Sequence, residues 1–552
     1  MKKNMLYALV AIVVVAVVVA AAAAIVLTTP PRKLQIELWY NSDGHYGDTE
    51  PAVAQVLKDS IESSGKISVT LRSEPWATYT DDFSEGRLPL FLLGWYPDYF
   101  DSDNYVSPFL TTDGAASLGS FYNDSQMNTW ISQQAATTND ATRTSLFQQI
   151  QGKLADDVPY IPLWQTGAHV VYDSDMTDVY LHPITFKWFI MDKPGATQIT
   201  GGTTDDVTSF DPASAYDYFS IEVINNVFDT LLVYEPETAD LMPGLATEVP
   251  SVANGGVSAD GKNYTYHLKT GVTFHDDTDF NATVMKWSIE RVIELDITGS
   301  PRFLLDSVGK IQSIDTPDDS TIVFRLSEPV SFFNQLMAFS VSAPVSMAAY
   351  NNNTEQPNAV GQVIGTGPYE LSQYIANQRV VLSRNLNYYN PGIYASFGIS
   401  SIPVLDTVTI ELMASATNLK QAVEAGTVNV AYRTLNPEDV TDLNGRETAL
   451  GITVDLGTSP QIRYLVFNVN TYSDVRLRQA IAYLVNRAEI DSRVFSGLAE
   501  PLWSMVPSAM PYSQPIFQTE YGSTPNVAAA NGLLTQLGYT LFYENVIARD
   551  WF

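Results

Sequence analysis

The sequence predicts an α/β fold that is divided into two lobes. With 552 residues and 45% hydrophobic content, the chain can bury a large core, and its length favours more than one lobe. The stretch from Leu34 to Pro97 alternates strand-like and helix-like patterns in a β-α-β-β rhythm. Further along, amphipathic stretches begin at residues that cap helices well. These three observations indicate sheets covered by helices and exclude a disordered chain.

The first feature in chain order is an uninterrupted apolar run, Met5–Leu27, with Arg32 and Lys33 after it. At about 1.5 Å per residue this run spans a hydrocarbon core of roughly 30 Å, whereas the apolar part of a cleavable signal has about 7–15 residues. We therefore expect residues 1–33 to form a single-pass transmembrane anchor that places the rest of the chain outside the cell. The alanine run Ala20–Ala24 leaves a cleaved signal as the alternative.

Hydrophobic periodicity and capping residues then predict the elements of the folded part. Near the N-terminus we expect a strand at Leu34–Asn41, a helix at Asp48–Gly65, strands at Lys66–Pro75 and Leu88–Pro97, and a helix capped by Asp140. A β-rich region begins at Thr197, and later helices follow the N-caps Asn281 and Asp474. The last predicted helix is Pro525–Tyr539, closed by Gly538.

Composition excludes several classes of partner and chemistry. A formal net charge of −31 repels nucleic acid phosphates and anionic lipid headgroups. Without cysteine there is no disulfide, thiolate nucleophile or cysteine-based zinc site. No G-x-S-x-G or H-E-x-x-H motif occurs, and His275 with its neighbouring aspartates is better interpreted as a turn than as a metal cluster. We predict no enzyme activity, no metal and no cofactor.

The strongest candidate for a binding group is Asp98, which follows the buried strand pattern of Leu88–Pro97. The apolar run ends abruptly in Trp95, Tyr96, Asp98 and Tyr99. Ligands of α/β folds bind at such strand ends. A partly desolvated carboxylate there pairs well with an ammonium group. The alternative is that Asp98 and Asp101 cap a turn.

Several longer motifs resemble those of a known family. They are Thr265–Val292, Gly365–Tyr374, Val380–Asn390 and Val475–Ile490. This succession resembles the extracellular substrate-binding proteins (family 5) of the oligopeptide, dipeptide and nickel ABC importers. Two segments that such proteins carry last, GW-x-x-D-Y and P-x-I-P-L, stand first here, at Gly94–Tyr99 and Val158–Leu163. The chain looks like a circular permutation of that family, with an archaeal-like N-terminal membrane anchor.

The resemblance implies a two-lobe, periplasmic-binding-protein-like fold of the large class II type, circularly permuted, plus one transmembrane helix. We expect lobe I as a continuous stretch, 164–456, and lobe II split into 34–163 and 457–552. The two crossovers are expected near Pro162–Trp164 and Gly457–Pro460. The final segment, Thr540–Phe552, is either a partial substitute for a strand or a chance likeness. Gly365 and Gly367 are expected to take positive φ in a turn.

The resemblance also implies a function. We expect a monomeric receptor that captures oligopeptides by hinge closure and hands them to an ABC permease. The family's W-x-x-D-Y aspartate, Asp98 here, is expected to hold the peptide's α-amino group, with Trp95 and Tyr99 beside it. Further lining is expected from Tyr216, Tyr218 and Trp503.

Three alternatives stay open at the level of sequence. Oligosaccharides are favoured by the tyrosine, tryptophan, asparagine and glutamine content, because sugars stack on aromatic rings and bond to amides. An anchored hydrolase would also be acidic and rich in aromatic residues, although no pair of carboxylates is positioned persuasively. A degenerate copy that folds without binding ligand is the third.

Overall fold

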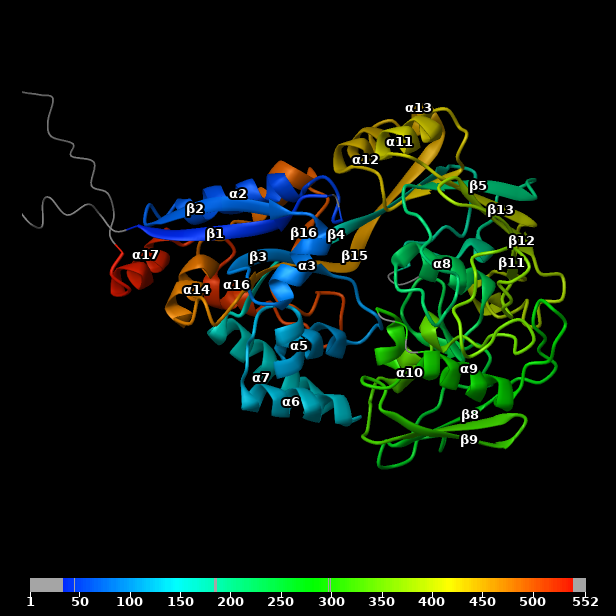
Figure 1. Cartoon of the computed structure of the whole chain (residues 1–552). Coiled ribbons are helices and arrows are strands. Elements are labelled where there is room, and N and C mark those ends of the chain that lie inside the picture. The colour runs from blue at the N-terminus through cyan, green and yellow to red at the C-terminus, as the bar shows by residue number, and fades with distance from the viewer. Residues whose placement is uncertain (1–32, 44, 183–185, 296, 298, 540–552) are drawn as a thin grey trace, which may run out of the picture.

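One large mixed sheet organises the protein. The computed structural model describes residues 33–43, 45–182, 186–295, 297 and 299–539. In this part of the chain the main sheet has eleven strands in the order β11-β12-β13-β5-β14-β4-β15-β3-β1-β2, and β16 pairs with β4 (Figure 1). Within the described ranges, no helix combines the length and apolar character that a membrane span requires. The predicted anchor, residues 1–33, lies almost wholly outside the described residues, as does Thr540–Phe552.

Two long antiparallel strands, β4 (Tyr160–Asp173) and β15 (Ile452–Phe467), run through the middle of the sheet. Residues 452–458 of β15 pair with residues 167–173 of β4, and 462–466 pair with 160–165 after a shift in register. Beyond the first stretch lie β14 and β5, and beyond the second lies β3. We call residues 34–164 and 462–539 the terminal half, and residues 167–458 the middle half.

The terminal half covers its part of the sheet with helices. β1 (Leu34–Asn41) pairs in parallel with both β2 (Ile67–Glu74) and β3 (Leu90–Trp95). The helices and the remaining strand are α2 (Glu50–Glu62), α3 (Trp76–Ser84), α4 (Ser107–Leu110), α5 (Thr112–Ser117), α6 (Ser125–Ala136), α7 (Asp140–Asp157), α14 (Val475–Ala482), α15 (Arg487–Ile490), β16 (Glu500–Pro501), α16 (Ile516–Tyr521) and α17 (Val527–Gln536).

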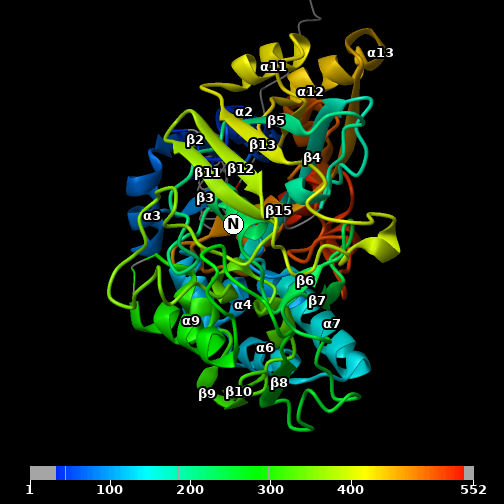
Figure 2. The same cartoon turned by 90° about the vertical axis from the view of Figure 1, so that its right-hand side faces the viewer.

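The middle half has a second set of elements, with α11 to α13 at one edge and the small β8–β10 sheet at the opposite edge (Figure 2). Its strands are β5 (Gln198–Thr203), β6 (Leu232–Tyr234), β7 (Leu241–Pro243), β8 (Asn263–His267), β9 (Ile311–Asp318), β10 (Thr321–Leu326), β11 (Tyr369–Ile375), β12 (Arg379–Arg384), β13 (Thr407–Leu412) and β14 (Val430–Tyr432). Its helices are α8 (Tyr218–Val227), α9 (Ala282–Leu295), α10 (Phe333–Leu336), α11 (Ala416–Glu424), α12 (Pro437–Asn444) and α13 (Glu447–Leu450).

Buried side chains divide along the same line. One hydrophobic cluster joins residues from Ile36 to Trp164 with residues from Ile462 to Leu534, so the two ends of the folded chain share a core. The other clusters draw on residues between 170 and 454. The exception is Tyr99, which leaves the terminal half and packs in a core of the middle half. The predicted lobe boundaries remain a prediction, and both expected crossovers fall within β4 and β15.

Most of the predicted helix starts are observed. Asn281 accepts a hydrogen bond from the Val284 amide at 3.1 Å, and Asp474 accepts one from the Arg476 amide at 3.0 Å. The predicted cap Asp140 is wrong by one residue, because Asn139 accepts from the Thr142 amide and Asp140 is already helical. Asparagine and aspartate are equally good N-cap residues, so the sequence alone does not decide which of the two neighbours caps the helix.

The prediction of positive φ at Gly365 and Gly367 is wrong, since neither glycine is among those with left-handed backbone. These glycines are needed for close approach instead. A Cβ atom would lie 2.2 Å from the Val227 carbonyl oxygen at the first position and 2.5 Å from the Val227 carbonyl carbon at the second. The segment therefore packs directly on the end of α8, and any larger residue would push the two apart.

Candidate functional site

The loop that follows β3 is held by a buried asparagine. Asn104 is 1% exposed, and its side-chain oxygen accepts from the indole Nε1 of Trp95 at 2.8 Å and from the Asp98 amide at 3.0 Å. Its amide nitrogen donates to Asp98 Oδ2 at 3.2 Å. A single side chain thus orients both the aromatic residue and the carboxylate that end the strand.

Asp98 lies between the two halves of the molecule. Its side chain is 7% exposed, and Oδ1 accepts a 2.5 Å hydrogen bond from the hydroxyl of Tyr216, which belongs to the middle half. Among the described residues no cation pairs with this carboxylate; Tyr216 and Asn104 are the groups that stabilise its charge. Burial raises the pKa of Asp98 to about 6, and these two hydrogen bonds oppose that rise. The site thus holds a carboxylate that lacks a positive partner.

Two more tyrosines meet across the same boundary. The Tyr96 hydroxyl donates to the Tyr218 hydroxyl at 2.9 Å, and the two rings are perpendicular with centroids 4.6 Å apart. Tyr216 is 38% exposed and contacts Phe303 edge-on at 5.7 Å. The exposed ring of Tyr216, from the middle half, and the carboxylate of Asp98, from the terminal half, therefore lie next to each other.

A partly buried cation lies behind these tyrosines, but its charge is already matched. The Arg433 guanidinium lies 3.9 Å from the centre of the Tyr218 ring. It donates to Glu222 at 2.6 Å and to Asp205 at 2.7 Å. Burial raises the pKa of the Glu222 carboxyl, and Arg433 opposes that rise. With two carboxylates bonded to it, Arg433 positions Tyr218 and does not present a free charge.

The structure places the other predicted residues differently. Tyr99 stacks on Phe332 at 4.8 Å and donates to Asp103 at 2.7 Å, so it packs the two halves together and is 2% exposed. Trp503 packs on the terminal core, with the Arg487 guanidinium 4.5 Å from its ring. Asp98, Trp95 and Tyr216 are joined through shared hydrogen bonds, whereas the contacts of Trp503 lead elsewhere.

The capping alternative is correct for Asp101. Its Oδ1 accepts from the Asp103 amide at 2.8 Å, and it pairs with Arg143, whose Nη1 lies 2.9 Å from Oδ2. Asp98 instead accepts from two side chains, one of them across the boundary. Sequence reasoning missed Asn104, Tyr96 as the partner of Tyr218, and Arg433. The only available signal was for Asn104, as a polar residue soon after a buried strand.

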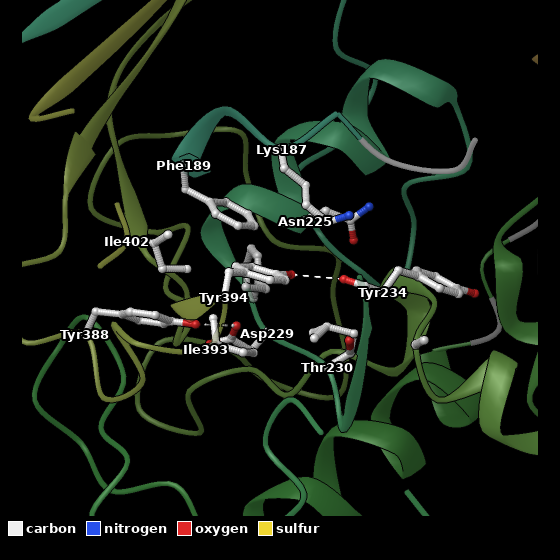
Figure 3. Close-up of a pocket in the computed structure, with 13 residues that line it drawn as sticks. Lys187, Phe189, Asn225, Asp229, Thr230, Tyr234, Tyr388, Ile393, Tyr394 and Ile402 are labelled. Atoms are coloured by element: carbon white, nitrogen blue, oxygen red, sulfur yellow. Dashed lines mark hydrogen bonds between the residues drawn. The ribbon is translucent and has the colours of Figure 1, made fainter. Parts of the chain in front are cut away.

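A cavity of about 40 Å³ lies wholly within the middle half (Figure 3). Several of its polar residues bond to nearby side chains or to backbone. Asp229 accepts from the hydroxyls of Tyr388 and Thr366, each at 3.2 Å, and Lys187 donates to the Glu235 carbonyl at 2.8 Å. Burial raises the pKa of Asp229 to about 7 and lowers that of Lys187 well below its ordinary value. A cavity of this size has room for little more than water, and we interpret it as internal packing.

No group of three or more metal-binding side chains occurs among the described residues. His275 bonds through one ring nitrogen to the Gly367 carbonyl at 3.1 Å and accepts from the Gly365 amide at 3.2 Å through the other. It therefore ties the turn at residue 275 to the segment that packs on α8.

Comparisons with known proteins place the sequence in a family. Among curated proteins, the glutathione-binding protein GsiB of Escherichia coli K12 is 27% identical over 349 residues, and that of Shigella flexneri is 26% identical over 349 residues. Each alignment covers 62% of this chain and 62% of the relative, so the match spans less than two thirds of those proteins.

Solved structures resemble parts of the chain at lower identity. The ABC transporter-associated periplasmic binding protein DppA of Helicobacter pylori, in complex with the peptide STSA, is 21% identical and has a TM-score of 0.47, covering 62% of this chain and 66% of that one. NikA of Brucella suis, in complex with Fe(III)-EDTA, is 18% identical and has a TM-score of 0.48, covering 62% and 64%. Residues 24–117 and 240–547 match the model of the bacterial extracellular solute-binding proteins, family 5. Because this match includes most of the sequence, the chain belongs to that family.

Proposed function

We propose that this protein is an extracellular receptor that binds peptides between its two halves and delivers them to an ABC permease. The observation that carries the proposal is the buried carboxylate of Asp98, which has no cationic partner among the described residues and faces the half-exposed Tyr216. Removing a carboxylate from water costs several kcal/mol unless an opposite charge compensates it. The α-ammonium group of a peptide supplies that charge.

The geometry supports capture by closure of the two halves. In the part of the chain that the structure describes, only β4 and β15 carry the sheet from one half to the other. The ligand groups named above come from both sides, Asp98 from the terminal half and Tyr216 from the middle half. A ligand that touches both halves binds the closed arrangement more tightly than an open one, so binding shifts the population toward closure. The closed shape is then what a permease recognises.

The curated relatives favour the same ligand chemistry. Those aligned above are named for glutathione, a peptide-like molecule that carries an α-ammonium group. Oligosaccharides are the second candidate, because the 38% exposed Tyr216 ring and the nearby Tyr96 and Tyr218 offer the aromatic surface on which sugars stack. A neutral sugar has no positive charge to pair with the Asp98 carboxylate, whereas a peptide has its α-ammonium group. Peptides are therefore the first candidate.

The membrane anchor and the circular permutation are also part of the proposal. Residues 1–33 are proposed to tether the receptor at the cell membrane. The start and end of the described fold lie close together: the Leu34 amide donates to the Lys66 carbonyl, and the Lys66 ammonium donates to the Asn531 carbonyl in α17 at 3.0 Å. Figure 1 shows α17 beside the start of β1. This proximity supports a rearranged order of an otherwise ordinary family 5 chain.

Native mass spectrometry of the purified fragment 34–552 tests the proposed function. We expect a bound peptide to co-purify, and calorimetric titration to show heat with peptides that have a free amino group. Labelled peptides should be recovered intact after incubation, as a receptor makes and breaks no bond. Binding of cello- or malto-oligosaccharides with no response to any peptide would overturn the peptide assignment in favour of sugars.

A further inference from the structure

The terminal half reaches into the core of the middle half directly after Asp98. The ring of Tyr99 stacks on that of Phe332, with 4.8 Å between the centroids and 9° between the planes. The two residues are 2% and 3% exposed. Phe100 is partly buried and packs against the cores of both halves. An apolar contact therefore crosses the boundary beside the proposed ligand group.

The end of α6 crosses the same boundary. The amide of Ser331, in the middle half, donates to the Ala135 carbonyl at 2.8 Å, and Ala135 packs against the core of the middle half. In Figure 1 this end of α6 points toward α10, which begins at Phe333. Because Ser331 precedes Phe332, the hydrogen bond from α6 and the ring of Tyr99 contact adjacent residues.

Hydrogen bonds join these two contacts into one unit of the terminal half. The Tyr99 hydroxyl donates to the buried carboxylate of Asp103 at 2.7 Å, and the side chain of Gln134 donates to the same carboxylate. Gln134 precedes Ala135 and also accepts from Arg143 at 3.1 Å. Tyr99 and the end of α6 are therefore fixed to the terminal half and move with it.

Separating the two halves would expose this apolar contact. The ring of Tyr99 would leave Phe332 and enter water, while its hydroxyl keeps the bond to Asp103 within its own half. Removal of a large ring from water favours the arrangement in which the ring is buried, and stacking on a second ring adds to that preference. The closed arrangement thus has a stabilising contact in which the ligand takes no part.

The other aromatic pair across the boundary is different in kind. Tyr96 and Tyr218 are both partly exposed, and they meet through their hydroxyls at 2.9 Å. Water takes over hydrogen bonds of this kind when the halves separate, so their net contribution to closure is small. Water does not replace the apolar stack of Tyr99 on Phe332.

We propose that Tyr99 raises the affinity of this receptor for every ligand without touching the ligand, because its ring docks on Phe332 only in the closed arrangement. This inference rests on the proposed function, which supplies the closure. The apparent affinity of a receptor is reduced by the fraction of molecules in the binding-competent form. A contact that exists only in the closed form increases that fraction, and with it the affinity.

The order of residues in the loop couples this contact to the ligand site. Asp98 and Tyr99 are neighbours, and each has its partner in the middle half, Tyr216 and Phe332 respectively. The closure that brings Asp98 to Tyr216 also brings Tyr99 to Phe332. Tyr99 is therefore a positioning residue for binding, in place of the ligand-lining residue that the sequence predicts.

Calorimetric titration of trialanine and trileucine into the purified full chain tests the inference. We expect Tyr99→Ala to weaken the binding of both peptides by the same factor, about ten- to fiftyfold. Phe332→Ala should cause a similar loss, and the double variant should bind no more weakly than the weaker single variant, because both substitutions remove one contact. Tyr99→Phe keeps the ring and should bind nearly as well as the unchanged protein.

A matched control distinguishes closure from stability. Tyr266 is fully buried in the same core, but its ring contacts Phe324 edge-on at 5.8 Å within the middle half. Tyr266→Ala should therefore lower the melting temperature and leave the affinity unchanged when titrated below that temperature.

The absence of cysteine from the chain allows a second measurement, of closure itself. Spin labels on Thr129→Cys and Glu328→Cys, two exposed positions on either side of the boundary, report the distance between the halves by pulsed electron paramagnetic resonance. We expect saturating peptide to enlarge a short-distance population. Tyr99→Ala should shrink that population in the free protein and at a fixed, half-saturating peptide concentration.

Several results would overturn the inference. Unchanged affinity in Tyr99→Ala, or losses that add up in the double variant, would show that the stack does not contribute to binding. A loss for one peptide and not for the other would make Tyr99 a ligand contact. If the labels respond to Tyr99→Ala but no peptide binds, the contact stands and the proposed function falls. If peptides bind and neither affinity nor label distance responds, the proposed function stands alone, and if nothing binds or responds, both fall.

Discussion

Two buried aspartates in this protein differ in how their charge is compensated, and only one of them is proposed to bind a ligand. Asp211, in the middle half, is fully buried and accepts from both terminal nitrogens of Arg291 and from the amides of Gln356 at 2.8 Å and Ala213 at 3.0 Å. Asp98, between the halves, is nearly as buried but is bonded to one tyrosine and one asparagine. Both aspartates are buried, and they differ in whether a positive charge compensates the carboxylate.

The comparison teaches that exposure alone does not locate a binding site. Asp211 sits only a few residues from Tyr216, in the segment that borders Asp98, yet its charge is completely matched. The cavity around Asp229 is similarly self-contained. Asp98 differs from Asp211 in having no cation bonded to it among the described residues. It differs from Asp229, which also accepts from hydroxyl groups, in that its tyrosine partner comes from the other half of the molecule.

The largest effect should come from breaking the complete pair. Arg291→Met leaves the Asp211 carboxylate buried without its cation, and we expect unfolding free energy to fall by about 3–5 kcal/mol. Asp98→Asn removes a charge that is not compensated and should change stability by less than about 1 kcal/mol. Urea unfolding of both variants checks the contrast. Equal losses of stability would mean that Asp98 is as structural as Asp211.

The next effect concerns pH. The pKa of Asp98 is raised to about 6, so the carboxylate is ionised above that pH and takes up a proton as the pH falls through it. Affinity for a peptide with a free amino group should therefore be nearly constant above about pH 7 and fall roughly tenfold between pH 7 and pH 5. Titrations across this range check the profile. Asp98→Asn should flatten it, and a profile that persists in the variant would place the titrating group elsewhere.

A smaller change is expected in overall shape. The proposed ligand groups come from both halves, and within the described residues only β4 and β15 join the two parts of the sheet. Saturating peptide should therefore reduce the radius of gyration measured by solution scattering. The reduction should be absent in Asp98→Asn at the same peptide concentration. A scattering curve that is identical with and without ligand would remove the support for closure.

The smallest effect is expected from rearranging the chain. Joining Tyr539 directly to Leu34 and opening the chain at Ala196, near the exposed Pro194 and Gly195, should restore the usual family order at little cost, because the joined ends are neighbours. This permuted protein should fold as a monomer and bind the same peptide as the fragment 34–552. An insoluble or molten product would show that the present chain order is required for the fold.

Much of this architecture could be predicted from local pattern, and the site only in part. Capping and periodicity were sufficient for the helices after Asn281 and Asp474 and for the strand that ends at Trp95. The bond between Asp98 and Tyr216 joins residues 118 positions apart, and no local pattern encodes it. The sequence predicts Tyr99 as a ligand-lining residue beside Asp98, and no local pattern reveals that it enters the core of the other half.

The other errors have similar causes. The expectation for Gly365 and Gly367 followed from the turn preference of glycine, whereas the true constraint is the approach of Val227 from a distant segment. Asn104 was overlooked because its position soon after a buried strand is a weak signal that many loop residues share, although it bonds to both Trp95 and Asp98. Tertiary contacts of this kind decide the site, and they become visible only in the folded chain.

The central claim is that Asp98 holds the amino group of a peptide, and a single calorimetric experiment tests it most directly. One peptide, with its amino group free or acetylated, is titrated into the unchanged fragment 34–552 and into Asp98→Asn at pH 7.5. We expect acetylation to weaken binding to the unchanged protein by about 1.5–3 kcal/mol, and to make no difference to the variant, since the charge-assisted hydrogen bond is already absent. If the free and acetylated peptides bind the unchanged protein equally well, Asp98 does not anchor the amine and the account is wrong.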